Sequence, residues 1–99
     1  METKLLAHLS AAIRDATHRP FTLSKSTPVG GGSINEAYRL EGNDGAGYFL
    51  KLNDAQHLPV FVAEAEGLNA IASTNTIRVP QAIAHGSAGG RSYLVLEHL

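Results

Sequence analysis

The chain has 99 residues, of which 43% are hydrophobic and 17% are charged, a size that fits one small domain with a modest core. Eight Lys and Arg residues against nine Asp and Glu residues leave a net charge of −1, which gives no electrostatic footprint for nucleic acid or an acidic membrane. The sequence has no cysteine, which excludes a disulfide framework, a thiolate zinc site and a thiol nucleophile. Neither a signal peptide nor an apolar run of bilayer-spanning length is found, so we expect a cytoplasmic protein.

The first element predicted is a helix over residues 2–17, which ends before Pro20. The apolar residues that repeat at helical spacing are Leu5, Leu9, Ala12, Ile13 and Ala16. Residues 21–29 are rich in Thr and Ser and predict a strand. Since Pro28 has no N–H to donate, we place this strand at an edge of the sheet.

A β-hairpin is predicted next. Residues 36–41 alternate between polar and apolar types, and residues 42–47 form a cluster of turn-forming Gly, Asn and Asp. The apolar run 48–52 then supplies the second strand. These two strands follow directly on the edge strand.

The remaining elements are a second helix and a second hairpin. Residues 59–73 are predicted to be helical, with Pro59 in the first turn where its missing N–H does no harm. The apolar stripe of this helix consists of Phe61, Ala65, Leu68, Ile71 and Ala72. Residues 79–85 and 91–96 are short apolar runs separated by a glycine-rich turn. The order of elements predicts an α+β fold with one mainly antiparallel five-stranded sheet.

Three consecutive glycines, Gly30, Gly31 and Gly32, lie between two predicted strands and let main-chain N–H groups approach a ligand without interference from a Cβ. A flexible hairpin turn is the simpler interpretation. A dinucleotide-binding loop requires a helix directly after the glycines, but residues 36–40 alternate like a strand, and the Gly-Lys-Ser/Thr of a P-loop is missing. What remains is the strand–loop–strand arrangement with which kinases cover ATP phosphates.

A kinase-type loop predicts a lysine on the next strand and a carboxylate on the following helix. Lys51 lies on that strand, on one face with Phe49 and Asn53, although a solvated lysine explains this strand equally well. On the helix, Glu64 falls within the apolar stripe, whereas Glu66 lies roughly 200° further round. Because a carboxylate on a buried stripe is costly without a cation, we predict that Glu64 pairs with Lys51.

Five segments, in order over nearly the whole chain, together resemble the fructosamine (ketosamine) kinase family. They are Gly-Gly-Gly-Ser-Ile-Asn-Glu-Ala-Tyr at 30–38, Tyr-Phe-Leu-Lys-Leu-Asn at 48–53, Ala-Glu-Ala-Glu-Gly-Leu at 63–68, Ile-Arg-Val-Pro at 77–80 and Ser-Tyr-Leu-Val-Leu-Glu at 92–97. Members of this family resemble aminoglycoside and choline kinases in fold and transfer the ATP γ-phosphate to a sugar hydroxyl of a glycated amine. The resemblance implies that residues 1–99 form a single domain, the N-terminal, nucleotide-binding lobe of a protein-kinase-like fold.

The resemblance also implies roles for individual residues. Lys51 is expected to contact the α- and β-phosphates of ATP, and Glu64 is expected to orient Lys51. The residues expected to cover the phosphates are Gly30, Gly31, Gly32, Ser33, Ile34 and Asn35. Glu97, His98 and Leu99 are expected to begin the hinge whose backbone meets adenine. Some relatives carry a cysteine in the loop where this chain has Ser33, so we expect no redox control through the loop.

The catalytic aspartate and the Mg²⁺-holding acidic motif of such a kinase are not found in this sequence. Asp15, Asp44 and Asp54 stand outside any His-x-Asp or Asp-Pro context, and the five histidines show no metal-ligand spacing. We therefore expect the catalytic residue and the metal ligands in a C-terminal lobe beyond Leu99. Residues 1–99 alone are expected to be inactive.

Two classes of function remain open from the sequence. The first is the ATP-binding lobe of a ketosamine kinase, with ATP, Mg²⁺ and a small ketosamine as partners; an aminoglycoside- or choline-type acceptor is the alternative within this class. The second is a non-catalytic module that uses the lobe fold for binding, or for self-association through exposed apolar surface. Neither class implies a nucleic acid or a membrane as partner.

Overall fold

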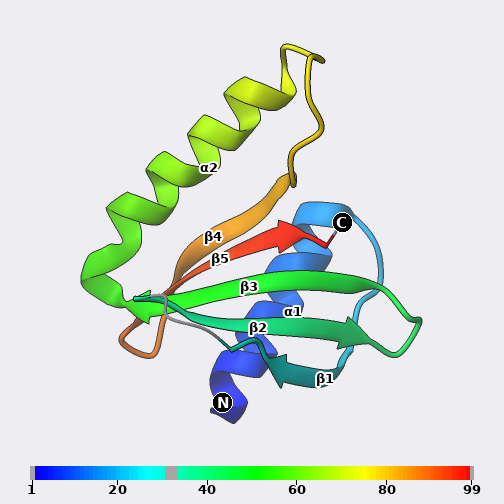
Figure 1. The fold of residues 1–99 in the computed structure, drawn as a ribbon. Coiled ribbons are helices and arrows are strands. Elements are labelled where there is room, and N and C mark those ends of the chain that lie inside the picture. Colours follow the sequence, from blue (N-terminus) through cyan, green and yellow to red (C-terminus); the bar gives the residue numbers. More distant parts are fainter. Residues whose placement is uncertain (1, 31–33, 99) are drawn as a thin grey trace.

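A computed structural model of the chain describes residues 2–30 and 34–98. The elements are α1 (Thr3–Thr17), β1 (Leu23–Pro28), β2 (Glu36–Gly42), β3 (Gly47–Asp54), a 3₁₀ turn (Ala55–His57), α2 (Leu58–Ala72), β4 (Ala82–Ala88) and β5 (Arg91–Glu97). The strands form one antiparallel sheet in the order β1-β2-β3-β5-β4 (Figure 1). The predicted α+β fold is confirmed. Within the described residues, the helices are too short and too polar to cross a membrane.

The two helices pack on opposite faces of the sheet. Alternate residues of β3 point to opposite faces. Leu50 and Leu52 are fully buried in a core cluster with the apolar face of α1. Phe49 instead packs with α2, in a second cluster built on Phe61 and Ala65. Lys51 therefore lies on the α2 face of the sheet.

α2 packs on the sheet only as far as Leu68. Phe61 and Ala65 pack against β5, but Ile71 is 40% exposed and Ala72 is exposed as well. The prediction that the apolar stripe continues to Ala72 is wrong because the helix extends past the sheet, so that its last turns have no strand beneath them (Figure 1).

The second hairpin lies further along the chain than its apolar runs suggest. β4 begins at Ala82, not at residue 79, and continues through residues 86–88, which were predicted to be part of the turn. The turn itself is only Gly89 and Gly90, with φ angles of 59° and 77°. Glycine tolerates positive φ, and a two-residue turn of this kind matches the twist of paired strands.

Gly86 is the glycine of β4 that packs against a buried aromatic ring. A Cβ on Gly86 would lie 2.8 Å from Tyr93 Oη, in a side chain that is only 4% exposed. This hydroxyl also lies 3.0 Å from His8 Nε2 of α1, and burial raises the pKa of Tyr93. Gly86 therefore leaves room for a contact that joins α1 to the sheet.

We expect Gly86→Ala to lower the free energy of unfolding by about 1–3 kcal/mol, because the rigid Tyr93 ring has to move. Gly67→Ala in α2 is the matched control. A Cβ there meets nothing within 4 Å, so alanine is expected to raise stability by up to about 1 kcal/mol through its helix propensity. Urea unfolding of both variants measures the difference. Equal effects of the two substitutions would contradict the packing argument.

Candidate functional site

A lysine–glutamate pair connects β3 to α2. Lys51 Nζ donates a hydrogen bond to Glu64 Oε2 at 2.7 Å, and the two side chains are 27% and 31% exposed. Glu66 is exposed, and Glu64 is the glutamate that pairs with Lys51, as the apolar stripe of the helix predicts. A pair this exposed contributes at most about 1 kcal/mol to stability. Its main effect is to hold the Lys51 ammonium in one place.

The packing of α2 sets this geometry. Phe61 is fully buried against the cluster that contains Leu94 and Leu96 of β5. Leu94 is the partner of Lys51 in the β3–β5 register, so the helix lies directly beside the lysine. Glu64 follows Phe61 by three residues, nearly one helical turn, and thus lies on the side of α2 that faces β3.

An apolar cavity lies on the same face of β3. It has a volume of about 270 Å³ and is lined by Phe49, Pro80, Leu96, Glu97 and His98. Phe49 precedes Lys51 by two residues, so the two positions are about 7 Å apart along the strand. An apolar recess next to a fixed ammonium suits a ligand with a flat apolar part and an anionic part.

The side chain of Glu97 has a structural partner of its own. Its carboxylate accepts a hydrogen bond from the Gln81 amide at 3.2 Å and pairs with Arg78 at 3.1 Å. In return, the Glu97 amide donates to the Gln81 carbonyl at 2.8 Å. Glu97 therefore holds the segment before β4 against the end of β5, while His98 is exposed at the cavity.

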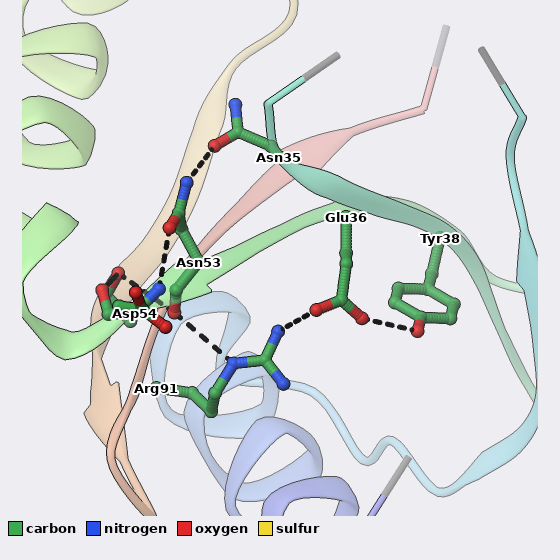
Figure 2. Close-up of polar contacts among 7 residues, drawn as sticks. Asn35, Glu36, Tyr38, Asn53, Asp54 and Arg91 are labelled. Atoms are coloured by element: carbon green, nitrogen blue, oxygen red, sulfur yellow. Dashed lines mark hydrogen bonds and ion pairs between the residues drawn. The ribbon is translucent and has the colours of Figure 1, made fainter. Parts of the chain in front are cut away.

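The glycine loop begins after β1 and ends at Asn35. Gly30 is exposed, and Ile34 is 85% exposed. Asn35 Oδ1 accepts a hydrogen bond from Asn53 Nδ2 at 2.8 Å, which places Asn35 against β3 on the face of Lys51 (Figure 2). Gly31, Gly32, Ser33 and Leu99 lie outside the described residues, so their predicted contacts stay predictions.

Two contacts next to this loop were not predicted from the sequence. The alternation of the strand placed Asn53 on one face with Lys51 and Phe49, but its hydrogen bond to Asn35 was not predicted. Arg91 forms an ion pair with Glu36, which is 55 residues away in sequence. No local pattern points to that contact.

Comparison with known proteins identifies the family of this chain. A family model described as fructosamine kinase matches residues 5–99. The chain belongs to the fructosamine kinase family. It is 48% identical over 91 residues to a Synechocystis sp. protein named “Probable ketoamine kinase”, covering 92% of this chain and 30% of the relative. It is 37% identical over 78 residues to “Protein-ribulosamine 3-kinase, chloroplastic” of Arabidopsis thaliana, covering 78% of this chain and 24% of that protein.

A solved structure shows the same fold for this fructosamine kinase family chain. The crystal structure named “Putative fructosamine-3-kinase”, from Haemophilus somnus, superposes with a TM-score of 0.86 at 27% identity. The match covers 92% of this chain and 30% of the other. The chain thus spans about a third or less of the length of these relatives.

A larger cavity of this fructosamine kinase family chain lies away from the candidate site. A recess of about 400 Å³ lies between α1 and β1, and none of its described lining residues is acidic. Two cations, Arg14 and Lys25, line this recess, and Arg14 donates to the Phe21 carbonyl at 2.8 Å. The smaller cavity is the candidate site because it lies on the face of β3 that carries the Lys51–Glu64 pair.

A metal site is not formed within the described part of the chain. Among residues 2–30 and 34–98, no three His, Asp or Glu side chains gather closely enough to hold an ion. The expectation that Mg²⁺ ligands lie outside this chain stays a prediction.

Proposed function

We propose that this chain forms the ATP-binding lobe of a kinase that phosphorylates a ketosamine. The Lys51–Glu64 pair is the observation that carries the proposal, because it fixes a cation beside an apolar recess on one face of the sheet. A half-buried ammonium held by a carboxylate can neutralise phosphate charge without losing its position. Membership of the fructosamine kinase family supports the same function.

In this proposal each part of the site takes one part of the nucleotide. Lys51 contacts the α- and β-phosphates, and Glu64 orients it. The cavity lined by Phe49 and Leu96 receives the adenine, with the backbone of residues 97–99 as the hinge. The loop residues 30–35 cover the phosphates. ATP supplies the phosphoryl group that is transferred.

The names of the relatives support the choice of acceptor. One relative is named for ketoamines, one for the 3-position of ribulosamines and one for the 3-position of fructosamines. We therefore infer transfer to the 3-hydroxyl of a ketosamine sugar. The general base and the Mg²⁺ ligands belong, in this proposal, to a C-terminal lobe, and residues 1–99 alone are inactive.

The non-catalytic alternative rests on exposed apolar side chains. Those of large size are Val29, Ile34, Val60, Ile71 and Ile77. Exposed apolar residues are common on folded proteins, and these are spread over three segments, so they support a docking surface only weakly. The specific ion pair favours the kinase.

The acceptor is tested with the full-length product of the gene that encodes this chain. Transfer of phosphate from ATP is measured with a fructosamine such as fructosyl-lysine, with an aminoglycoside and with choline. We expect the fructosamine to give the highest kcat/KM. A higher value with one of the other acceptors would overturn the ketosamine assignment, and no transfer to any of the three would favour the non-catalytic module.

A further inference from the structure

The end of β5 departs from the regular hydrogen-bonding pattern of the sheet. In an antiparallel pair, two residues that exchange main-chain hydrogen bonds each donate an amide to the carbonyl of the other. Ala82 is the register partner of Leu96, so Gln81 lies opposite Glu97, the last residue of β5 (Figure 1). The Glu97 amide donates to the Gln81 carbonyl at 2.8 Å, which is one half of the exchange. The other half is not formed in the regular way.

The side chain of Glu97 takes the place of its own main-chain carbonyl. The Gln81 amide donates to Glu97 Oε1 at 3.2 Å, and Arg78 pairs with Glu97 Oε2 at 3.1 Å. Each carboxylate oxygen therefore has a donor, which gives this side chain a defined orientation. Arg78 also offsets the negative charge of the carboxylate. As a result, the Glu97 carbonyl is spared from pairing with Gln81.

The spared carbonyl belongs to a residue that lines the apolar cavity. Glu97 forms part of the cavity wall together with Phe49, Pro80 and Leu96. A main-chain carbonyl is a strong acceptor, so one that its strand neighbour does not use favours a ligand that brings a donor. Adenine carries an amino donor at its 6-position, whereas a 6-oxo purine such as hypoxanthine carries an acceptor there. The cavity wall thus contains a group that can distinguish the two kinds of ring.

We propose that the side chain of Glu97 is a positioning group that keeps the Glu97 carbonyl available for a purine with a 6-amino group. Without the carboxylate, the Gln81 amide lacks its acceptor and closes the regular pair with this carbonyl. The cavity then loses its preference for an amino group over an oxo group. The carboxylate acts through Gln81 and does not touch the base. This inference rests on the proposed ATP-binding function and adds the device that selects the base.

The test compares ATP with inosine triphosphate (ITP), which has the same ribose and phosphates but a 6-oxo purine. Dissociation constants of both nucleotides are measured with Mg²⁺ by isothermal titration calorimetry on the full-length product of the gene that encodes this chain. We expect the unmodified protein to bind ATP at least about tenfold more tightly than ITP. Glu97→Ala is expected to reduce this ratio to less than about threefold, mainly by weakening ATP binding.

Two further variants separate the hydrogen bond from other effects of the substitution. In Glu97→Gln the side-chain oxygen can still accept from the Gln81 amide, so we expect the ratio to stay within about twofold of the unmodified value. Glu41→Ala is the matched control, because it removes the carboxylate of another arginine pair, Arg39–Glu41 at 3.4 Å, and it is expected to leave the ratio unchanged. If Glu97→Ala does not fold, Glu97→Met, which keeps the length of the side chain without its oxygens, is measured in its place.

Two results would overturn the positioning role. Glu97→Ala could weaken ATP and ITP by the same factor, which would show a structural role only. The unmodified protein could also bind the two nucleotides equally well, which would mean that the carbonyl does not select an amino group.

The failure of this proposal is distinguishable from the failure of the proposed function. If Lys51→Ala weakens the binding of both nucleotides while Glu97→Ala keeps the full ATP preference, the nucleotide site stands and the positioning role is wrong. If the unmodified protein binds neither nucleotide, the nucleotide site itself fails, and the positioning role fails with it.

Discussion

Replacing Lys51 by alanine is expected to lower the phosphotransfer turnover of the full-length gene product at least tenfold, a loss of about 1.4 kcal/mol or more of transition-state stabilisation. The ammonium is the cation that the structure fixes on the cavity face of β3, and Glu64 holds it at 2.7 Å. Because the pair is partly exposed, its loss has little effect on folding. Steady-state kinetics together with a melting curve separate the two effects.

The two glutamates of α2 provide the control for the lysine variant. Glu64→Gln keeps the shape of the side chain but removes the charge, and we expect lower turnover because the lysine is less firmly held. Glu66→Gln makes the same chemical change at an exposed position two residues away and is expected to leave turnover unchanged. Unchanged kinetics in Lys51→Ala, or equal losses in the two glutamine variants, would disprove the assigned roles.

Phe61→Ala is expected to lower the free energy of unfolding by about 3–5 kcal/mol, as is usual for removing a buried phenylalanine. Phe61 is fully buried, and it is the largest side chain with which α2 packs on the sheet. The ring of His57 packs against it edge-on at 4.7 Å. Since Glu64 lies nearly one turn further along, loosening this contact also displaces the partner of Lys51. Denaturant unfolding measures the loss.

Val60→Ala is the control for the core variant. Val60 is the preceding residue in the same helix, and it is 53% exposed. We expect its substitution to change stability by no more than about 0.5 kcal/mol. A similar loss in both variants would mean that α2 is not anchored through Phe61.

The parts of the site that depend on local periodicity were predictable from the sequence. The alternation of β3 places Phe49, Lys51 and Asn53 on one face, and the period of α2 distinguishes Glu64 from Glu66. Both patterns act within a single element, where the geometry is known from the residue types. The Lys51–Glu64 pair followed because an unpaired carboxylate on an apolar stripe is costly.

The parts that depend on tertiary arrangement were not predictable in this way. The contact between Arg91 and Glu36 requires that β3 lie between β2 and β5, and no short segment encodes that order. The exposure of Ile71 has a similar cause, because it depends on where the sheet ends beneath α2. Gly89 and Gly90 form the second turn. Residues 86–90 are all Gly, Ser or Ala, so the sequence did not show which two of them form the turn.

In the proposed function, the α2 face of the sheet binds ATP through Lys51 and the adjoining apolar cavity. Chemical-shift mapping of the ¹⁵N-labelled chain with Mg-ATP tests this most directly. We predict that the largest amide shifts occur at Phe49, Lys51, Glu97 and His98. Shifts concentrated on the recess between α1 and β1, or no shifts at millimolar ATP, would contradict the claim.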